Sequence, residues 1–256
     1  MSAVEPAVTG RPEPDDGELA KLALRDIPLI LMYHAVADVS HDPNMLAVSP
    51  RRFAAQLGYL QRLGLRGVAI GTLVAAMRAG RARGLVGITF DDGYASVLEN
   101  AVPELTRRGF TATVFVISDR LSGENDWDDG TPWPLVSAVQ VGELAAAGIE
   151  IGSHSATHTH LAGADSEVLK SEISGSRQRL SQVADAEIRG FAYPYGDMDE
   201  AARRAVRDAG YEYACAVSAP RADLGLMALP RMYVGENDGS GRMIAKRLLF
   251  RRHTTH

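Results

Sequence analysis

The sequence predicts an α/β fold, a distorted (β/α) barrel of seven or eight parallel strands with outer helices. Short β-branched or apolar runs alternate regularly with helical patterns, which is typical of parallel strands joined by right-handed crossovers. No dinucleotide fingerprint is present, so a closed or nearly closed barrel is favoured over an open sheet, and no organic cofactor is expected. Polar residues follow several of the expected strands, where barrels of this type carry their reactive groups.

The individual elements follow from local patterns. A helix is expected to begin at Ser49, with the serine as its cap and Pro50 in the first turn. Phe53, Leu57 and Leu60 then share one helical face. Strands are predicted at 27–33, 67–70, 85–90, 111–117, 149–151, 191–193 and 213–217. Further helices are predicted around Leu73 and Met77 and at 97–108, 137–147, 166–183 and 199–209, the long one with Leu169, Ile173 and Leu180 inward.

We expect three parts: a flexible arm at 1–26, with an arm that ends in a short helix as the alternative, the barrel domain at 27–240, and a basic helix or tail at 241–256. The 256 residues are 46% apolar and 23% charged, as in an ordinary globular protein. A net charge of −5 argues against extensive nucleic-acid binding. Cys215 is the sole cysteine, which excludes an internal disulfide, and its apolar surroundings predict a core position.

The arm has no apolar signal region, and no run of 18 apolar residues occurs. We therefore predict a cytoplasmic protein that meets small or lipid-linked substrates. The segment 243–252 is basic and amphipathic. A terminal helix that covers the barrel is the favoured interpretation, and peripheral contact with an anionic membrane is the alternative. The sequence makes no prediction of oligomeric state.

Asp91 and Asp92 follow the expected strand 85–90. Two like charges so close repel each other unless a cation holds one of them. A metal on one carboxylate would leave the other as a general base. The alternative is an Asp-Asp-Gly turn that caps the next helix.

His154 and His158 lie four residues apart and can reach one point if a tight loop or helical turn joins them. Neutral imidazoles suit zinc, and also cobalt or nickel. His160 is a less favoured candidate ligand. Two histidines and an aspartate leave positions open for water and a substrate oxygen, whereas a structural zinc site would have four protein ligands. The set therefore predicts metal-assisted hydrolysis.

Two further features are ambiguous by themselves. His34 ends an apolar strand, where a lone histidine is usually a hydrogen-bonded core residue. The run Phe191-Ala-Tyr-Pro-Tyr-Gly196 is by itself a turn signal. A long loop at 119–134 is expected at the rim of the site.

Taken together, Thr89-Phe-Asp-Asp-Gly93, His154-Ser-Ala-Thr-His158 and Phe191-Ala-Tyr-Pro-Tyr-Gly196 resemble the first three motifs of the polysaccharide deacetylases, carbohydrate esterase family four. The resemblance covers residues 27–235. Leu31-Met-Tyr-His34 resembles the subgroup of poly-N-acetylglucosamine deacetylases, in which permutation moves the last motif's histidine to the front. The family implies a distorted barrel and metal-dependent hydrolysis of N-acetyl groups on amino sugars. Another amide, a formamide or a cyclic imide is the alternative substrate, and a sugar-binding relic is the non-enzymatic one.

The resemblance also implies roles. Asp91 would be the catalytic base, His34 the acid that protonates the leaving amine, and the backbone N–H of Tyr195 an oxyanion donor. One divalent metal ion, zinc before cobalt or nickel, would be held by Asp92, His154 and His158.

The chain departs from the family pattern in two places. Ala192 stands where the third motif often has an arginine that orients the catalytic aspartate. Arg231 is our candidate substitute, and Arg189 is a weaker one. The fourth motif's tryptophan is not recognisable, and His253 and His256 lie in a polar tail as incidental residues.

Overall fold

The computed structural model describes residues 27–127, 130, 132–217 and 224–255. The predicted N-terminal arm lies outside these residues. Within them, one parallel sheet has the strand order β10-β9-β8-β7-β6-β5-β1-β11, and β4 pairs with β5 beside this path. Its strands are β1 (Ile30–Tyr33), β4 (Arg66–Val68), β5 (Leu85–Phe90), β6 (Thr113–Val116), β7 (Glu150–Ser153), β8 (Gly190–Ala192), β9 (Tyr213–Ala216), β10 (Leu229–Pro230) and β11 (Met232–Tyr233).

The last two strands close this sheet into a barrel. In β10, Leu229 pairs with Cys215 of β9, whereas in β11 Met232 pairs with Leu31 of β1. Only Arg231 separates β10 from β11, so one short segment bridges the two ends of the strand order. The predicted fold class, a distorted (β/α) barrel of parallel strands, is therefore confirmed.

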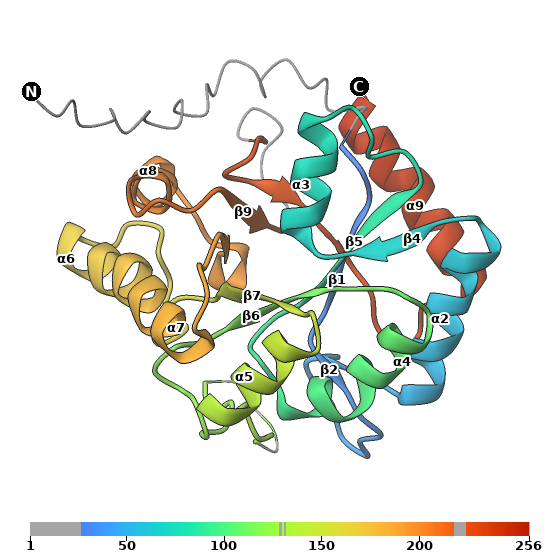
Figure 1. Cartoon of the computed structure of the whole chain (residues 1–256), viewed down its shortest axis with the longest axis horizontal. Coiled ribbons are helices and arrows are strands. Elements are labelled where there is room, and N and C mark those ends of the chain that lie inside the picture. Colours follow the sequence, from blue (N-terminus) through green and yellow to red (C-terminus); the bar gives the residue numbers. More distant parts are fainter. Residues whose placement is uncertain (1–26, 128–129, 131, 218–223, 256) are drawn as a thin grey trace, which may run out of the picture.

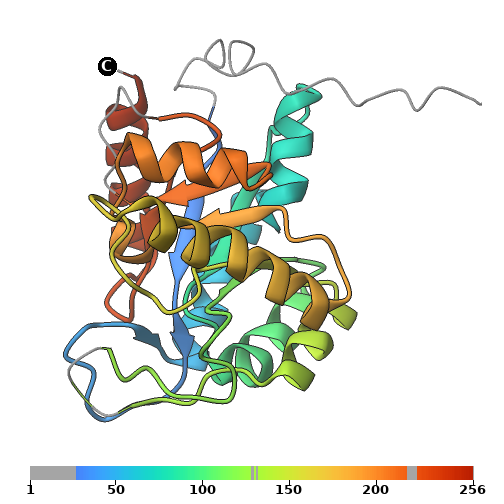
Figure 2. The same cartoon turned by 90° about the vertical axis from the view of Figure 1, so that its left-hand side faces the viewer.

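Helices surround the sheet (Figure 1). Figure 2, which shows the molecule rotated by 90° from Figure 1, shows that α8 lies beside the long helical stretch that ends in α7. These elements are α2 (Pro50–Arg62), α3 (Ile70–Arg78), the π-helical η2 (Val97–Ala101), α4 (Val102–Arg107), α5 (Ala138–Ala146), α6 (Ser166–Leu169), the π-helical η3 (Lys170–Gly175), α7 (Ser176–Ala184), the short η4 (Pro194–Gly196), α8 (Glu200–Asp208) and α9 (Ser240–Thr255).

The predicted helix start at Ser49 is confirmed, because the Ser49 side chain accepts a hydrogen bond from the Arg52 N–H and Pro50 occupies the first turn. The predicted strand at 67–70 was too long, since β4 ends at Val68 and α3 begins at Ile70. The short parallel pair β2 (Ala35–Val36) and β3 (Ala47–Val48) was not predicted. Strands of two residues are too short for any alternation to appear in the sequence.

Two predicted helices contain a stretch of π-helix. The helix at 97–108 begins with η2, and the helix at 166–183 contains η3 between α6 and α7. Such wide turns are rare in proteins, and those that occur are often found at functional sites. They shift which residues face the barrel without ending the helix.

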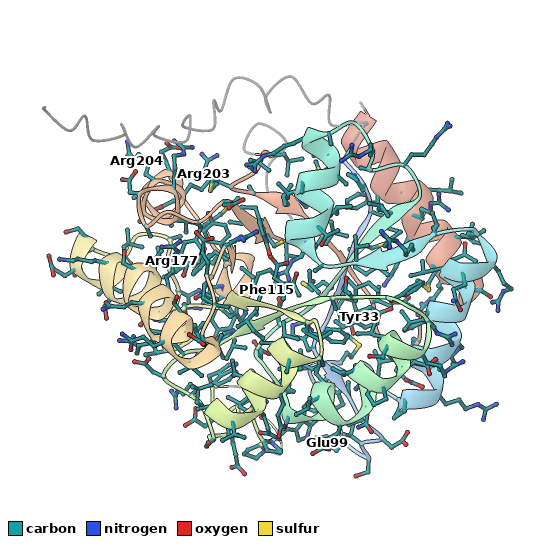
Figure 3. All side chains as sticks on the ribbon, viewed as in Figure 1. Tyr33, Glu99, Phe115, Arg177, Arg203 and Arg204 are labelled. Carbon is teal, nitrogen blue, oxygen red and sulfur yellow. The ribbon has the colours of Figure 1, made fainter. Side chains whose placement is uncertain are left out.

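The core lies between the helices and the sheet. Tyr33 and Phe115 lie inside the molecule, and Arg204 lies on α8 at its edge (Figure 3). The Tyr33, Phe53 and Phe90 rings pack at centroid distances of 5.3–5.8 Å. Cys215 is fully buried, as predicted.

Helix α9 packs against the barrel. Met243 is buried, and Lys246 Nζ donates to the Tyr233 carbonyl at 3.0 Å. Ile244, Leu248 and Leu249 remain exposed. Among the described residues, no helix is both long enough and apolar enough to cross a membrane.

A substitution at Gly190 on β8 tests how tightly the barrel is packed. A Cβ at Gly190 would overlap the buried Tyr213 ring, whereas a Cβ at Gly142 on α5 would meet no atom within 4 Å. We expect Gly190→Ala to lower the free energy of unfolding by about 1–3 kcal/mol through overpacking. Gly142→Ala should raise it by about 0.5–1 kcal/mol, because alanine favours the helix. Urea unfolding monitored by circular dichroism measures both, and a neutral Gly190→Ala would contradict the close packing.

Candidate active site

The ends of separate strands bring the predicted polar residues to one cavity of about 210 Å³. Its lining includes His34 after β1, Asp91 and Asp92 after β5, His154 and His158 after β7, Tyr195 after β8, and Arg231 between β10 and β11. A larger groove of about 1090 Å³ lies beside α9, but its described lining contains no histidine or cysteine. The smaller cavity is therefore the candidate active site.

Asp92, His154 and His158 form a buried cluster that could hold a metal ion. Asp92 Oδ1 lies 3.3 Å from His154 Nε2 and 3.4 Å from His158 Nε2. Donor atoms bound tetrahedrally to one ion at about 2.0–2.1 Å are roughly 3.3–3.4 Å apart. The spacing of these atoms therefore fits a zinc-like cation.

The hydrogen bonds of this cluster also fit a cation. His154 Nδ1 lies 2.8 Å from the Ala192 carbonyl, which can only accept, so Nδ1 carries a proton. In the neutral ring the Nε2 lone pair then faces Asp92. Asp92 Oδ1 is buried and has no hydrogen-bond partner among the described residues. A cation between these atoms would satisfy both acceptors, and the Ala192 carbonyl would orient the ligand.

The charge states within the cluster follow from burial and proximity. Burial lowers the pKa of His158 to about 4, so this imidazole is neutral at neutral pH. Burial raises the pKa of Asp92, but His154, His34 and His158 outweigh it and hold that pKa well below its usual range. Burial lowers the pKa of His154, but the two carboxylates outweigh it and raise that pKa. A bound cation would compete with the proton on His154.

The backbone of the site is strained at several positions. Asp92, Ser155 and His158 have φ values of 68°, 66° and 68°, in the left-handed region. For residues other than glycine, each such position costs roughly 1–3 kcal/mol and persists only when the surroundings hold it. The loop between the histidines is thus a tight turn rather than a helical one.

Asp91 lies beside the cluster and is paired with Arg231. The guanidinium donates Nη1 to Asp91 Oδ1 at 2.5 Å and Nη2 to Oδ2 at 2.7 Å, and Nη1 also reaches Thr89 Oγ1 at 3.2 Å. Burial raises the pKa of Asp91, but Arg231 and His154 outweigh it and leave the pKa below its usual value. Arg189, the weaker candidate, is exposed and pairs with Glu187 instead.

The remaining candidates lie around the mouth of the cavity. His34 is half-buried, and its Nδ1 has no hydrogen-bond partner among the described residues. Tyr195 has a φ of 58°, and its ring lies 4.5 Å from His158 and 4.2 Å from His160. His160 is exposed, with Nδ1 3.0 Å from Asp197 Oδ2, and lies outside the metal cluster.

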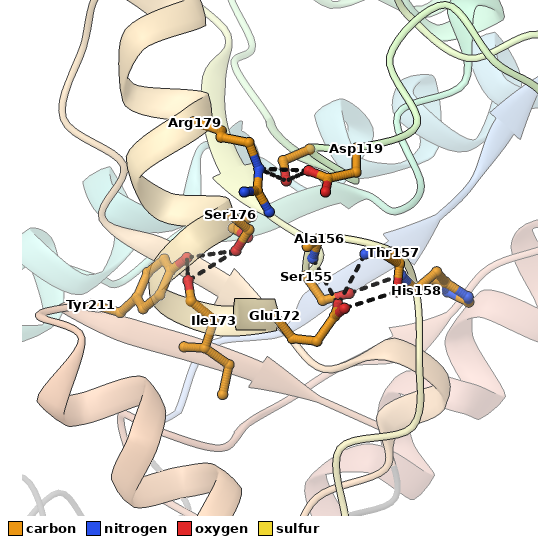
Figure 4. Close-up of polar contacts among 12 residues, drawn as sticks. Asp119, Ser155, Ala156, Thr157, His158, Glu172, Ile173, Ser176, Arg179 and Tyr211 are labelled. Atoms are coloured by element: carbon orange, nitrogen blue, oxygen red, sulfur yellow. Dashed lines mark hydrogen bonds and ion pairs between the residues drawn. The ribbon is translucent and has the colours of Figure 1, made fainter. Parts of the chain in front are cut away.

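Two residues at the site were not singled out from the sequence. The Trp127 ring, from the loop at 119–134, lies 4.7 Å from the His158 ring. Glu172 on η3 accepts hydrogen bonds from Ala156 and Thr157, between the two histidines (Figure 4). An acid within a helical pattern normally faces water, so the sequence carries no signal for Glu172. For Trp127, the rim position of the loop was the available signal.

The Asp91–Arg231 pair has a testable energetic consequence. Both side chains are buried, so Arg231→Met should lower the free energy of unfolding by about 3–5 kcal/mol, because an uncompensated carboxylate remains. Asp91→Asn in the same chain should restore most of the loss. Urea unfolding measures both, with Arg189→Met as the exposed control, expected to change by less than about 0.5 kcal/mol. If Arg231→Met and Arg189→Met lowered the free energy of unfolding equally, Arg231 would not compensate the buried charge of Asp91.

Comparisons with known proteins found one curated relative and several solved structures of similar fold. YxkH of Bacillus subtilis, named as a polysaccharide deacetylase, is 27% identical over 209 residues, 80% of this chain and 70% of YxkH. The Streptococcus pyogenes deacetylase PplD, solved with acetate, has a TM-score of 0.73 at 22% identity, covering 86% of this chain and 97% of that one. IcaB from Ammonifex degensii has a TM-score of 0.66 at 24% identity, covering 89% and 97%. These two structures share the fold.

The family itself is identified by a sequence model. The model of the polysaccharide deacetylases matches residues 79–214, more than half of the chain. This stretch contains Asp91, Asp92 and both histidines of the cluster. The chain therefore belongs to the polysaccharide deacetylase family.

Proposed function

We propose that this protein is a metal-dependent hydrolase that removes the N-acetyl group from an amino sugar. The observation that carries the proposal is the cluster of Asp92, His154 and His158 beside the Arg231-paired Asp91. This arrangement could hold a cation and leaves a second, unligated carboxylate beside it in the same cavity. The family supports carbohydrate deacetylation, so a formamide, an imide or another amide is the less favoured substrate.

In this proposal Asp92, His154 and His158 would hold one divalent ion, with zinc favoured and cobalt and nickel as alternatives. When bound, such an ion polarises a carbonyl and acidifies water. Asp91 accepts the proton of the attacking water. Arg231 keeps Asp91 ionised and fixes both of its oxygens, the role that an arginine in the third motif would otherwise have.

His34 and Tyr195 act on the other atoms of the reacting amide. His34 donates a proton to the sugar nitrogen as the C–N bond breaks and acetate leaves. The backbone N–H of Tyr195 donates to the oxygen that becomes negative. Both residues line the same cavity as Asp91, which supports these roles.

The cavity volume supports a small reacting group. About 210 Å³ accommodates an acetamido group, and the rest of the sugar would lie over the rim. Trp127 and Tyr195 contribute aromatic rings there, each within 5 Å of the His158 ring. Aromatic faces pack against the C–H faces of sugar rings, so this rim suits a carbohydrate.

Catalysis is tested with variants that separate base, acid and metal ligand. Asp91→Asn and His34→Ala should each lower kcat by about 10²–10⁴ while zinc content stays near one per chain. His154→Ala should lose zinc as well as activity. Acetate release from N-acetylglucosamine oligomers, with N-formyl and imide compounds in parallel, measures turnover, and elemental analysis measures the metal.

His41→Ala serves as the matched control, because His41 is exposed and lies outside both the metal cluster and the lining of the active-site cavity. Its zinc content and kcat should stay within about twofold of the unaltered protein. Near-native turnover by zinc-loaded Asp91→Asn would disprove the assignment of the base.

The exposed side of α9 concerns location rather than chemistry. Met243 and Lys246 hold α9 against the barrel, in agreement with the favoured interpretation of a terminal helix that covers it. The exposed Ile244 and Leu248, with basic residues around them, are the side chains through which the alternative, contact with an anionic membrane, would occur. Ile244→Ser with Leu248→Ser should at least halve the fraction that sediments with phosphatidylglycerol vesicles. Neutral vesicles are the control, and equal sedimentation of both proteins would contradict membrane contact through α9.

A further inference from the structure

The turn between the two histidines has a backbone that needs external support. Ser155 and His158 both lie in the left-handed region, with φ of 66° and 68°. Within the turn, the His158 N–H donates to Ser155 Oγ at 3.0 Å. Since residues other than glycine pay free energy for this conformation, the surrounding structure must hold it.

Glu172 provides that support. Its Oε2 accepts the backbone N–H groups of Ala156 and Thr157, both at 2.9 Å, and its Oε1 accepts the Thr157 hydroxyl at 2.8 Å. Glu172 is itself buried, with 7% of its surface exposed. The carboxylate thus binds two of the three residues between His154 and His158, as Figure 4 shows.

The π-helical stretch η3 fixes where Glu172 lies. The Ile173 carbonyl accepts the Ser176 hydroxyl at 2.9 Å and the Tyr211 hydroxyl at 3.1 Å. Ser176 Oγ also lies 2.8 Å from the Oγ of Ser153, the last residue of β7. Because His154 follows Ser153 directly, this network ties the helix that carries Glu172 to the strand that carries the first histidine.

We propose that Glu172 is a positioning residue for the metal ligands. By holding the turn between them, Glu172 sets the separation of the His154 and His158 side chains. This inference rests on the metal site of the proposed function. The charge of Glu172 matters as well as its shape. A glutamine in its place could accept the two N–H groups only through a neutral carbonyl oxygen, with its NH₂ group turned toward the Thr157 hydroxyl. It would therefore lose the charge assistance that makes hydrogen bonds to a carboxylate about twice as strong.

Zinc affinity distinguishes positioning from mere stability. Glu172→Gln should weaken zinc binding by about 10–100-fold, the usual effect of losing a group that orients ligands. Glu167→Gln is the matched control, because it removes the same charge from an exposed position on the same helical stretch and should leave the affinity unchanged. Competition with a chromophoric chelator measures the zinc dissociation constant, and thermal melting in EDTA measures the stability of the metal-free protein.

A second variant covers the case in which Glu172→Gln does not fold. Thr157→Val removes only the hydroxyl donor from an exposed residue and should weaken zinc binding by about two- to fivefold. A lower melting temperature with an unchanged zinc dissociation constant in the folded variant would overturn the inference while leaving the proposed function intact. Absence of zinc binding by the unaltered protein would overturn both.

Discussion

Two neighbouring carboxylates, Asp91 and Asp92, are buried at the end of one strand, and the rest of the site depends on how their charges are compensated. Buried carboxylates without partners would be protonated or would destabilise the fold. Arg231 compensates Asp91 through two hydrogen bonds, and the two imidazoles face Asp92. The two acids therefore differ in their partners, since Asp91 is held by an arginine and Asp92 belongs to a cluster that could hold a cation.

The closure of the barrel supplies the first of these partners. Arg231 lies between the two short strands that join the ends of the sheet, and its side chain reaches inward to Asp91. Ala192, at the position where the family often has an arginine, instead contributes its carbonyl to His154 Nδ1. The site therefore has an alanine on β8 and an arginine on the segment that closes the barrel, and the arginine is the partner of the acid Asp91. Arg231 thus balances the charge of Asp91, and the Ala192 carbonyl orients His154.

The second set of partners depends on a strained turn. His154 extends directly from β7, but His158 reaches the same point only because the backbone passes through left-handed conformations. Glu172, carried by a wide helical turn, holds this path from the outside. The conformational free energy of the strained turn is thus offset by the hydrogen bonds that Glu172 accepts from it. The geometry of the site therefore depends on the helical stretch that follows the motif as well as on the motif itself.

The sequence by itself determined the strand–helix alternation, the family, and the identities of the acids and histidines that meet at the cavity, because hydrophobic period and short motifs are local properties. It also indicated Arg231, although only as a candidate that a resemblance suggested. The tertiary structure alone decided that Arg231 rather than Arg189 contacts Asp91, that Trp127 lies against His158, and that Glu172 binds the turn between the histidines. These contacts join residues distant in the sequence, and a buried partner of this kind has the same letter and the same helical period as an exposed one. The four strands of two residues, β2, β3, β10 and β11, could not be predicted either, since two residues cannot show a period. The pairing of β10 and β11 is set by the closure of the barrel, and β2 and β3 pair with each other in a separate sheet.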